Sequence, residues 1–143
     1  MKCVFFGHRN IWADISERIE KAIRLVHRDY QINLFLVGNN GNFDYMVQRI
    51  LSKLENELPI DYVVMLSRID ERTLYSPQEK TVFHEGLENV PYRFAISRRN
   101  ETMLSNADIL ITYVSNKFSN SYKLMEKARQ RQIHIINLYD GEL

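Results

Sequence analysis

The sequence reads Leu34-Phe35-Leu36-Val37-Gly38-Asn39-Asn40-Gly41-Asn42-Phe43-Asp44 in its first third. The apolar beginning of this stretch is typical of a buried strand, and its glycines and asparagines are typical of a loop. After the loop, apolar side chains recur at helical spacing as far as Leu54. A helix that begins directly after a strand presents unpaired N–H groups and a positive dipole end, which favour an anion such as phosphate. An ordinary strand-to-helix turn shows the same pattern, so this loop alone leaves both interpretations open.

The residue types of this loop suit close approach to a ligand. Gly38 and Gly41 lack a Cβ, so the backbone can come near a bound group. Asn39 and Asn40 tolerate a left-handed backbone better than most residues. Asp44 can hydrogen-bond a ribose hydroxyl or cap the following helix, and both roles stay open.

Apolar runs of the same kind predict four further strands. The five expected strands are Cys3–Phe6, Leu34–Val37, Asp61–Leu66, Asp108–Val114 and Ile133–Leu138. Helices are expected between them: one opened by a capping box of Asp14 and Glu17, one at Asn42 to about Glu57, one at Ala95–Ala107, and one after Ser121.

Strands that are apolar on both faces and alternate with helices predict an α/β fold. We expect a three-layer Rossmann-like domain with a mostly parallel five-stranded sheet. It should be a single domain over residues 1–143, with an irregular flap at about residues 67–94.

Composition and missing motifs exclude several classes of function. The formal net charge of +1 argues against a general nucleic-acid coat and against a membrane-surface protein. The single cysteine, Cys3, is expected to be buried, and no residue spacing indicates a metal. The chain has neither a P-loop nor the Gly-x-Gly-x-x-Gly loop of dinucleotide dehydrogenases, and we expect no cofactor. No apolar run approaches the roughly 20 residues that span a bilayer, so we expect a cytoplasmic protein without membrane contact.

In a Rossmann-like sheet the ligand crevice lies at the carboxyl ends of the strands, where three loops should meet. These loops are Gly7–Asn10, Gly38–Asp44 and Ser115–Ser121. Arg9 could bind phosphate through two parallel hydrogen bonds, and His8 could donate a hydrogen bond or act as an acid or base. A solvated arginine and a local histidine cap are the alternative roles.

Two further stretches fit an anion site. Ser97-Arg98-Arg99-Asn100 is expected to open a helix, where the dipole disfavours cations unless an anion lies nearby. Exposure to water or pairing with nearby carboxylates is the alternative for these arginines. Ser119, Asn120 and Ser121 precede the last helix and suit either an N-cap or a phosphate cradle.

Several segments of the chain together carry a family resemblance. They are Phe6-Gly7-His8-Arg9, Gly38 to Asp44, Tyr75-Ser76-Pro77-x-Glu79, Glu85 to Asn100, Met103 and Ala107-Asp108. This pattern resembles the small bacterial and phage members of the SLOG superfamily, and the resemblance runs over nearly the whole chain. That superfamily groups DNA-processing Smf/DprA-type proteins with the LOG cytokinin-riboside monophosphate phosphoribohydrolases.

The resemblance implies a Rossmann-like fold that binds a nucleotide or a nucleotide-derived ligand. The positions that match family motifs are Gly7, Arg9, Gly38, Gly41, Asp44, Arg99 and Met103. Arg99 and Met103 correspond to the Arg-x-x-x-Met of LOG enzymes, whose arginine serves ligand binding and catalysis.

One catalytic motif of LOG enzymes is missing from this chain. Those enzymes follow the fourth strand with Pro-Gly-Gly-x-Gly-Thr-x-x-Glu, and the glutamate is catalytic. This chain has Ser115-Asn116-Lys117-Phe118-Ser119-Asn120-Ser121 instead, and Glu126 follows too late to replace the glutamate. The expected function is therefore ligand binding, as a sensor or as an enzyme of unknown reaction.

The expected ligand-binding residues are Gly7, His8, Arg9, Gly38, Asn39, Asn40, Gly41, Phe43, Asp44, Arg99, Asn100, Met103, Ser119, Asn120 and Ser121. One alternative is an N-glycosidic hydrolase or transferase acting on nucleoside monophosphates, with Asp44, Glu79 and Arg99 as candidate catalytic residues. A second alternative is a single-stranded DNA-binding accessory protein that uses the basic residues of the last helices. A homodimer is expected by analogy with other Rossmann-like proteins of this size.

Overall fold

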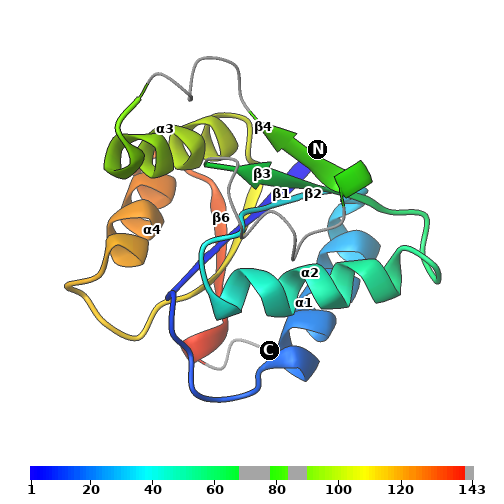
Figure 1. Ribbon diagram of the computed structural model, residues 1–143. Helices are drawn as coiled ribbons and strands as arrows, with labels where there is room; N and C mark the ends of the chain where they lie inside the picture. The colour runs from blue at the N-terminus through cyan, green and yellow to red at the C-terminus, as the bar shows by residue number, and fades with distance from the viewer. Residues whose placement is uncertain (68–77, 84–89, 141–143) are drawn as a thin grey trace.

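The computed structural model describes residues 1–67, 78–83 and 90–140. This part of the chain forms one parallel sheet between two layers of helices (Figure 1). The strands are β1 (Lys2–Gly7), β2 (Leu34–Val37), β3 (Asp61–Leu66), β4 (Thr81–Phe83), β5 (Ile109–Tyr113) and β6 (His134–Asn137). The helices are α1 (Ser16–Tyr30), α2 (Asn42–Leu54), α3 (Tyr92–Ser105) and α4 (Asn120–Gln130), with short 3-10 turns η2 (Gln78–Lys80) and η4 (Leu138–Asp140). The predicted α/β, Rossmann-like fold is confirmed. Within the described residues, no helix is both long and apolar enough to cross a membrane.

The strand order places a crevice beside the first strand. The sheet runs β4-β3-β2-β1-β5-β6, so the winding moves outward from β1 and then reverses to β5 on its other side. In a sheet of this kind ligands bind at the carboxyl ends of the two strands between which the winding reverses. Gly7 of β1 and Tyr113 of β5 are register partners at this edge.

Side chains of the central strands alternate between two cores. Cys3 and Phe5 belong to the core under α1 and α2, whereas Val4 and Phe6 belong to the core under α3 and α4. All four side chains are buried. A sheet covered on both faces explains why these strands are apolar without interruption. Cys3 is buried as predicted, and its burial raises the pKa of the thiol.

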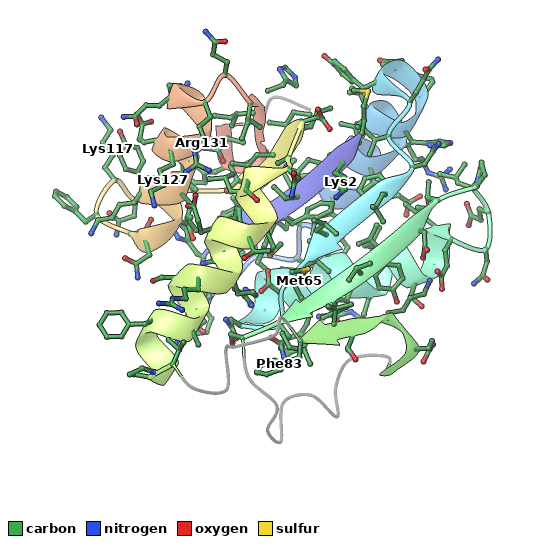
Figure 2. The ribbon with its side chains drawn as sticks, turned by 90° about the horizontal axis from the view of Figure 1, so that it is seen from above. Lys2, Met65, Phe83, Lys117, Lys127 and Arg131 are labelled. Atoms are coloured by element: carbon green, nitrogen blue, oxygen red, sulfur yellow. The ribbon has the colours of Figure 1, made fainter. Side chains whose placement is uncertain are left out.

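The sheet has six strands, not the predicted five. β4 pairs parallel with β3, with Thr81 opposite Val64 and Phe83 opposite Leu66. It is three residues long and Val82 is 46% exposed, so no apolar run marks it in the sequence. It lies at the sheet edge opposite to β6, and Figure 2 shows Phe83 there, away from the α4 residue Lys127. Most of the predicted flap at 67–94 lies outside the described residues.

Three helices begin at other residues than predicted, among them α4, which begins at Asn120 and not after Ser121. The N-cap of α1 is Ile15, which makes no side-chain capping bond. Asp14 accepts hydrogen bonds from the N and Oγ atoms of Ser16 (3.0 and 2.6 Å), so the predicted capping box does not form. Helix α3 begins at Tyr92, not at Ala95.

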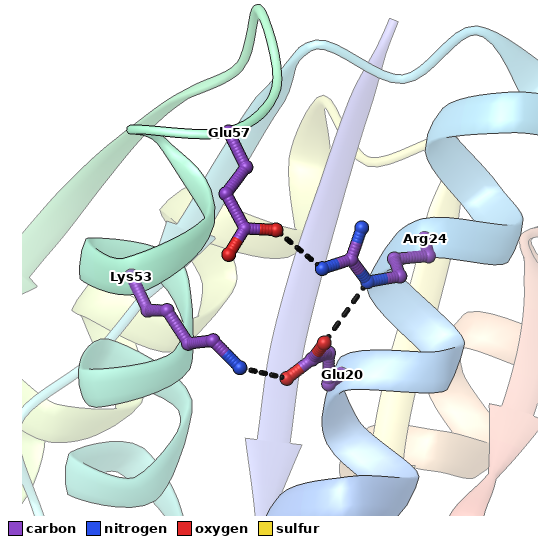
Figure 3. A network of polar contacts seen from close by, with 4 residues as sticks. All are labelled: Glu20, Arg24, Lys53 and Glu57. Carbon is purple, nitrogen blue, oxygen red and sulfur yellow. Dashed lines mark hydrogen bonds and ion pairs between the residues drawn. The ribbon is translucent and has the colours of Figure 1, made fainter.

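Charged side chains connect α1 to α2 and the turn that follows it (Figure 3). Glu20 accepts hydrogen bonds from Nζ of Lys53 (2.8 Å) and from Nε of Arg24 (3.0 Å). Arg24 also donates to Glu57 at 2.5 Å. Lys53 belongs to the last turn of α2, so this network holds the end of the helix that lies away from the cavity described below.

Candidate functional site

A cavity of about 330 Å³ lies at the carboxyl edge of the sheet, beside the end of β1. Four segments meet there: the end of β1 with the residues after it, the loop before α2 with the first turn of that helix, the middle of α3 and the start of α4. The lining residues are Phe6, Gly7, His8, Arg9, Asn40, Asp44, Ile96, Arg99, Asn100, Ser119, Asn120, Ser121 and Leu124. The structure thus brings together ten of the fifteen expected ligand residues, from segments far apart in the sequence.

Hydrogen bonds join the loop after β1 to the start of α2. The backbone N–H of Asn42 donates to the carbonyl oxygen of Arg9 at 2.9 Å. The side-chain oxygen of Asn42 accepts from the N–H of Ile11 at 2.8 Å, and its amide nitrogen donates to the Ile11 carbonyl. A Cβ on Gly41 would lie 2.6 Å from both Cα and the carbonyl oxygen of Arg9. Glycine at position 41 therefore permits the close backbone contact that fixes Arg9 at the cavity.

Gly38 makes room for two charged side chains. A Cβ at this position would lie 2.6 Å from Nη1 of Arg99 and 2.9 Å from Oδ2 of Asp44. The carbonyl oxygen of Gly38 accepts a hydrogen bond from Nε2 of the buried Gln48 at 2.9 Å, which anchors the loop from below. The guanidinium and the carboxylate consequently lie side by side over the end of β2.

Arg99 is 3% exposed although it carries a full charge. Its Nε and Nη2 donate to Oδ1 of Asn100 (3.0 and 2.6 Å), and its Nη1 donates to the carbonyl oxygen of Met65 at 3.4 Å. With the Asn40 amide oxygen turned toward the guanidinium, Nη1 and Nη2 both donate to it at 3.1 Å. These neutral oxygens help to orient the guanidinium at the cavity wall.

The position of Arg99 corrects the expectation that both arginines open a helix. Since α3 begins at Tyr92, Arg98 and Arg99 lie inside it, and the argument from the helix dipole does not apply. The two neighbours also have different environments, because Arg98 is exposed and Arg99 is buried. Burial of Arg99 is a stronger indication of a specific role than its place along the helix.

Among the described residues that line the cavity, one carries a carboxylate, and that residue is Asp44. Its Oδ2 accepts a hydrogen bond from the backbone N–H of Asn40 at 2.9 Å. Burial raises the pKa of this carboxyl, while the charge of Arg99 and the Asn40 N–H act in the opposite direction. The negative charge of Asp44 therefore offsets part of the positive charge of Arg99, although burial removes water from the Asp44 carboxylate.

His8 connects the ends of the two central strands. Its Nε2 accepts a hydrogen bond from the backbone N–H of Ser115 at 2.8 Å, and its ring meets the Tyr113 ring edge to face. Partial burial lowers the pKa of His8, in keeping with a neutral ring that accepts this bond. The proton of the neutral ring then lies on Nδ1.

The start of α4 faces the cavity. Ser119 is its N-cap, and its Oγ accepts a hydrogen bond from the N–H of Tyr122 at 3.1 Å. Ser119, Asn120 and Ser121 all line the cavity, so the positive end of this helix dipole is directed there. The N-cap role expected for this segment is confirmed, and it leaves the phosphate-cradle role open.

Five expected ligand residues do not line the cavity but lie behind it. Gly38, Asn39 and Gly41 shape the loop before α2, and Tyr45 reinforces that loop by donating to the Asn39 carbonyl at 3.0 Å. Phe43 is buried beneath Gly7, where a Cβ would lie 2.5 Å from its ring. Met103 is fully buried in the core under α3.

Glu79, a candidate catalytic residue, lies away from the cavity. It belongs to η2, whose next residue, Lys80, bonds to Asp61 at 2.6 Å. Asp61 is the first residue of β3, so this pair marks the amino edge of the sheet, opposite to the cavity.

Three lining residues were not expected at the site: Phe6, Ile96 and Leu124. All three are apolar, and apolar residues in strands and helices indicate core positions in a sequence. Phe6 lies one residue before the end of β1, whereas Ile96 and Leu124 lie inside α3 and α4, so their positions in the sequence give no signal of the cavity.

A comparison of the sequence with models of known protein families finds no match, and neither does a comparison with curated protein sequences. Among the residues that the structure describes, no group of three or more histidine, cysteine or carboxylate side chains is arranged to hold a metal ion.

Proposed function

We propose that this protein binds a nucleotide or a nucleotide-derived ligand in the cavity beside β1. The observation that carries this proposal is the convergence of two arginines, Arg9 and Arg99, and the N-terminus of α4 on one cavity. Backbone N–H groups at a helix start and guanidinium groups are the donors that phosphate prefers in proteins.

Each part of the cavity suits a part of such a ligand. A phosphate group would lie between Arg9, Arg99 and Ser119. A phosphate oxygen accepts a stronger hydrogen bond than a neutral amide, so it would replace one of the amide oxygens that now face Arg99. Asp44 would accept a hydrogen bond from a ribose hydroxyl.

Size and apolar lining favour a nucleotide over a bare anion. At about 330 Å³ the cavity is at the lower end of the range of small-molecule sites, and far larger than phosphate requires. Phe6, Ile96 and Leu124 supply apolar surface beside the polar groups, as a base or ribose would need.

The test is isothermal titration calorimetry with the common ribonucleoside 5′-monophosphates. We expect at least one to bind in the micromolar range. Arg99→Lys keeps the charge beside Asp44 but removes the planar fork, and should weaken binding at least about tenfold. Arg98→Lys is the matched control, since it makes the same change on the exposed neighbour. Equal affinity of the two variants would rule out the role of Arg99, and no binding of any monophosphate would refute the proposed function.

A second candidate function is N-glycosidic hydrolysis or transfer on nucleoside monophosphates. The observation that favours it is the presence of the Asp44 carboxylate inside the cavity, where it could stabilise positive charge that develops on a ribose. Chromatographic detection of free base after incubation with each monophosphate decides the matter. Release by the wild type and none by Asp44→Asn would support catalysis, and no release from any monophosphate would eliminate it.

The contacts of the basic side chains on α4 favour a small ligand over single-stranded DNA. Arg131 and Lys127 contact Glu101 at 2.5 and 3.5 Å, and Arg129 contacts Glu126 at 3.2 Å. The pairs of Arg129 and Arg131 offset part of the positive charge that a DNA backbone would require.

A further inference from the structure

A second cavity of about 500 Å³ adjoins the first between α3 and α4. The two share the lining residues Arg9, Ile96, Asn100, Asn120 and Leu124. The second cavity adds Ser97, Lys123 and Lys127, whereas His8, Asp44, Arg99 and Ser119 line only the first. The two cavities are therefore continuous but differ in chemistry.

The second cavity has two lysines on one side. Lys123 and Lys127 are four residues apart on α4, so both ammonium groups project from the same helix face. Both side chains are exposed, and Figure 2 shows Lys127 on the α4 side of the molecule. Arg9 lies at the junction with the first cavity.

The ion pair of Lys127 leaves its charge accessible to a ligand. Its Nζ lies 3.5 Å from Glu101, whereas Arg131 contacts the same carboxylate at 2.5 Å. Arg131 contacts Oε1 of Glu101 and Lys127 contacts Oε2, so the carboxylate keeps its closer ion pair with Arg131 when Lys127 turns toward an anion, although Oε2 loses its contact.

We propose that this second cavity binds a second phosphate of the ligand, held by Lys123 and Lys127. The proposal rests on nucleotide binding in the first cavity and specifies the ligand class further. Arg99 lines one cavity and the lysines line the other, so the two phosphates would belong to separate positions of the ligand, as in a nucleoside 3′,5′-bisphosphate. Ile96 and Leu124, which line both cavities, would contact the sugar or base between them.

The experiment compares each ribonucleoside 5′-monophosphate with the 3′,5′-bisphosphate of the same nucleoside by calorimetry at one salt concentration. We expect the bisphosphate to bind about tenfold more tightly in the wild type, as two partly exposed lysine contacts would provide. In the double variant Lys123→Gln, Lys127→Gln the ratio of the two dissociation constants should fall below about two. Lys21→Gln, on the exposed side of α1, is the control for a change in net charge and should keep the wild-type ratio.

The possible outcomes distinguish this inference from the proposed function. If monophosphates bind and bisphosphates gain nothing, the second phosphate site is refuted while nucleotide binding stands. If the bisphosphate gain persists in the double lysine variant, the lysines are not the site and the inference is equally refuted. If no nucleotide binds at all, both proposals fail together. Thermal unfolding of each variant checks that the substitutions leave the fold intact.

Discussion

Gly38 and Arg99 are packed so closely that the guanidinium occupies the space of a Gly38 side chain, with Nη1 2.6 Å from the position of a Cβ. We predict that Gly38→Ala displaces the guanidinium and destabilises the fold by about 1 kcal/mol, the lower end of the cost of overpacking, because the atoms it meets are the ends of flexible side chains. Nucleotide affinity should fall with it. Urea unfolding and calorimetry of the variant measure the two effects.

A double-mutant cycle identifies the cause of that destabilisation. In an Arg99→Lys background the rigid fork is gone, so Gly38→Ala should destabilise less than in the wild type. An equal effect in both backgrounds would mean that the backbone, or Asp44, sets the requirement for glycine.

Asp44 should make stability depend on pH in a defined direction. Burial raises the pKa of its carboxyl above the ordinary value of 3.8, so the folded state keeps a proton that the unfolded state has already lost. Its contribution to the free energy of unfolding therefore decreases as pH rises from about that value through the raised pKa. Urea unfolding across this range measures the free energies of unfolding of the wild type and Asp44→Asn. As pH rises, the wild type should lose stability relative to the variant. A shift in the opposite direction would show that Arg99 outweighs burial.

His8 should titrate below its ordinary pKa of 6.5, because burial disfavours the charged ring and Nε2 accepts the bond from Ser115. Its contribution to stability is fully present above 6.5 and decreases as pH falls from there through the lowered pKa. NMR titration of the histidine ring protons, assigned by comparison with His8→Gln, measures this value. A midpoint above 6.5 would contradict the assignment of a neutral, hydrogen-bonded ring.

Two substitutions at Ser119 distinguish its role as a helix cap from a role in ligand binding. Ser119→Ala removes the cap of α4 and should lower stability by about 1 kcal/mol. Ser119→Asp can still accept the Tyr122 N–H and should preserve stability, but its negative charge would repel a phosphate and weaken nucleotide binding by about tenfold or more. Ser119→Asn, which is uncharged and can also accept the Tyr122 N–H, controls for the added negative charge. Undiminished affinity in Ser119→Asp would place the phosphate elsewhere.

The contact between Glu20 and Lys53 should contribute little by itself. Lys53, the leading cause, and Arg24 lower the pKa of Glu20, yet the lysine side chain is 55% exposed. We expect a coupling free energy of about 0.5 kcal/mol in the cycle of Glu20→Gln and Lys53→Gln, decreasing at high salt. A coupling that salt leaves unchanged would indicate a buried interaction.

The sequence predicted the sheet well because its central strands are buried on both faces. Val4 and Phe5 point to opposite cores, so no polar residue interrupts the run. The sequence did not predict β4. This short edge strand is not buried on both faces, as the exposed Val82 shows, so it needs no uninterrupted run of apolar residues.

The sequence predicted which residues line the cavity where topology alone places a residue. Gly7, Asn40 and Ser119 follow strands or precede helices, and parallel winding brings such positions to one edge. Burial of Arg99 between Asn40 and Asn100 depends on side-chain packing, which no local pattern reveals. Glu79 was misplaced because η2 lies within a segment without clear periodicity.

The parallel register has a consequence for the order of events in folding. The N–H of Lys2 donates to Asp108, 106 residues further along the chain, and Cys3 pairs with Ile109. During synthesis, the edge of β1 that pairs with β5 therefore stays unpaired until the ribosome has made most of the polypeptide. The cavity needs both β1 and α4, so it cannot form before α4 has been synthesised. A nascent chain stalled before β5 would expose an unpaired strand edge and have no ligand site.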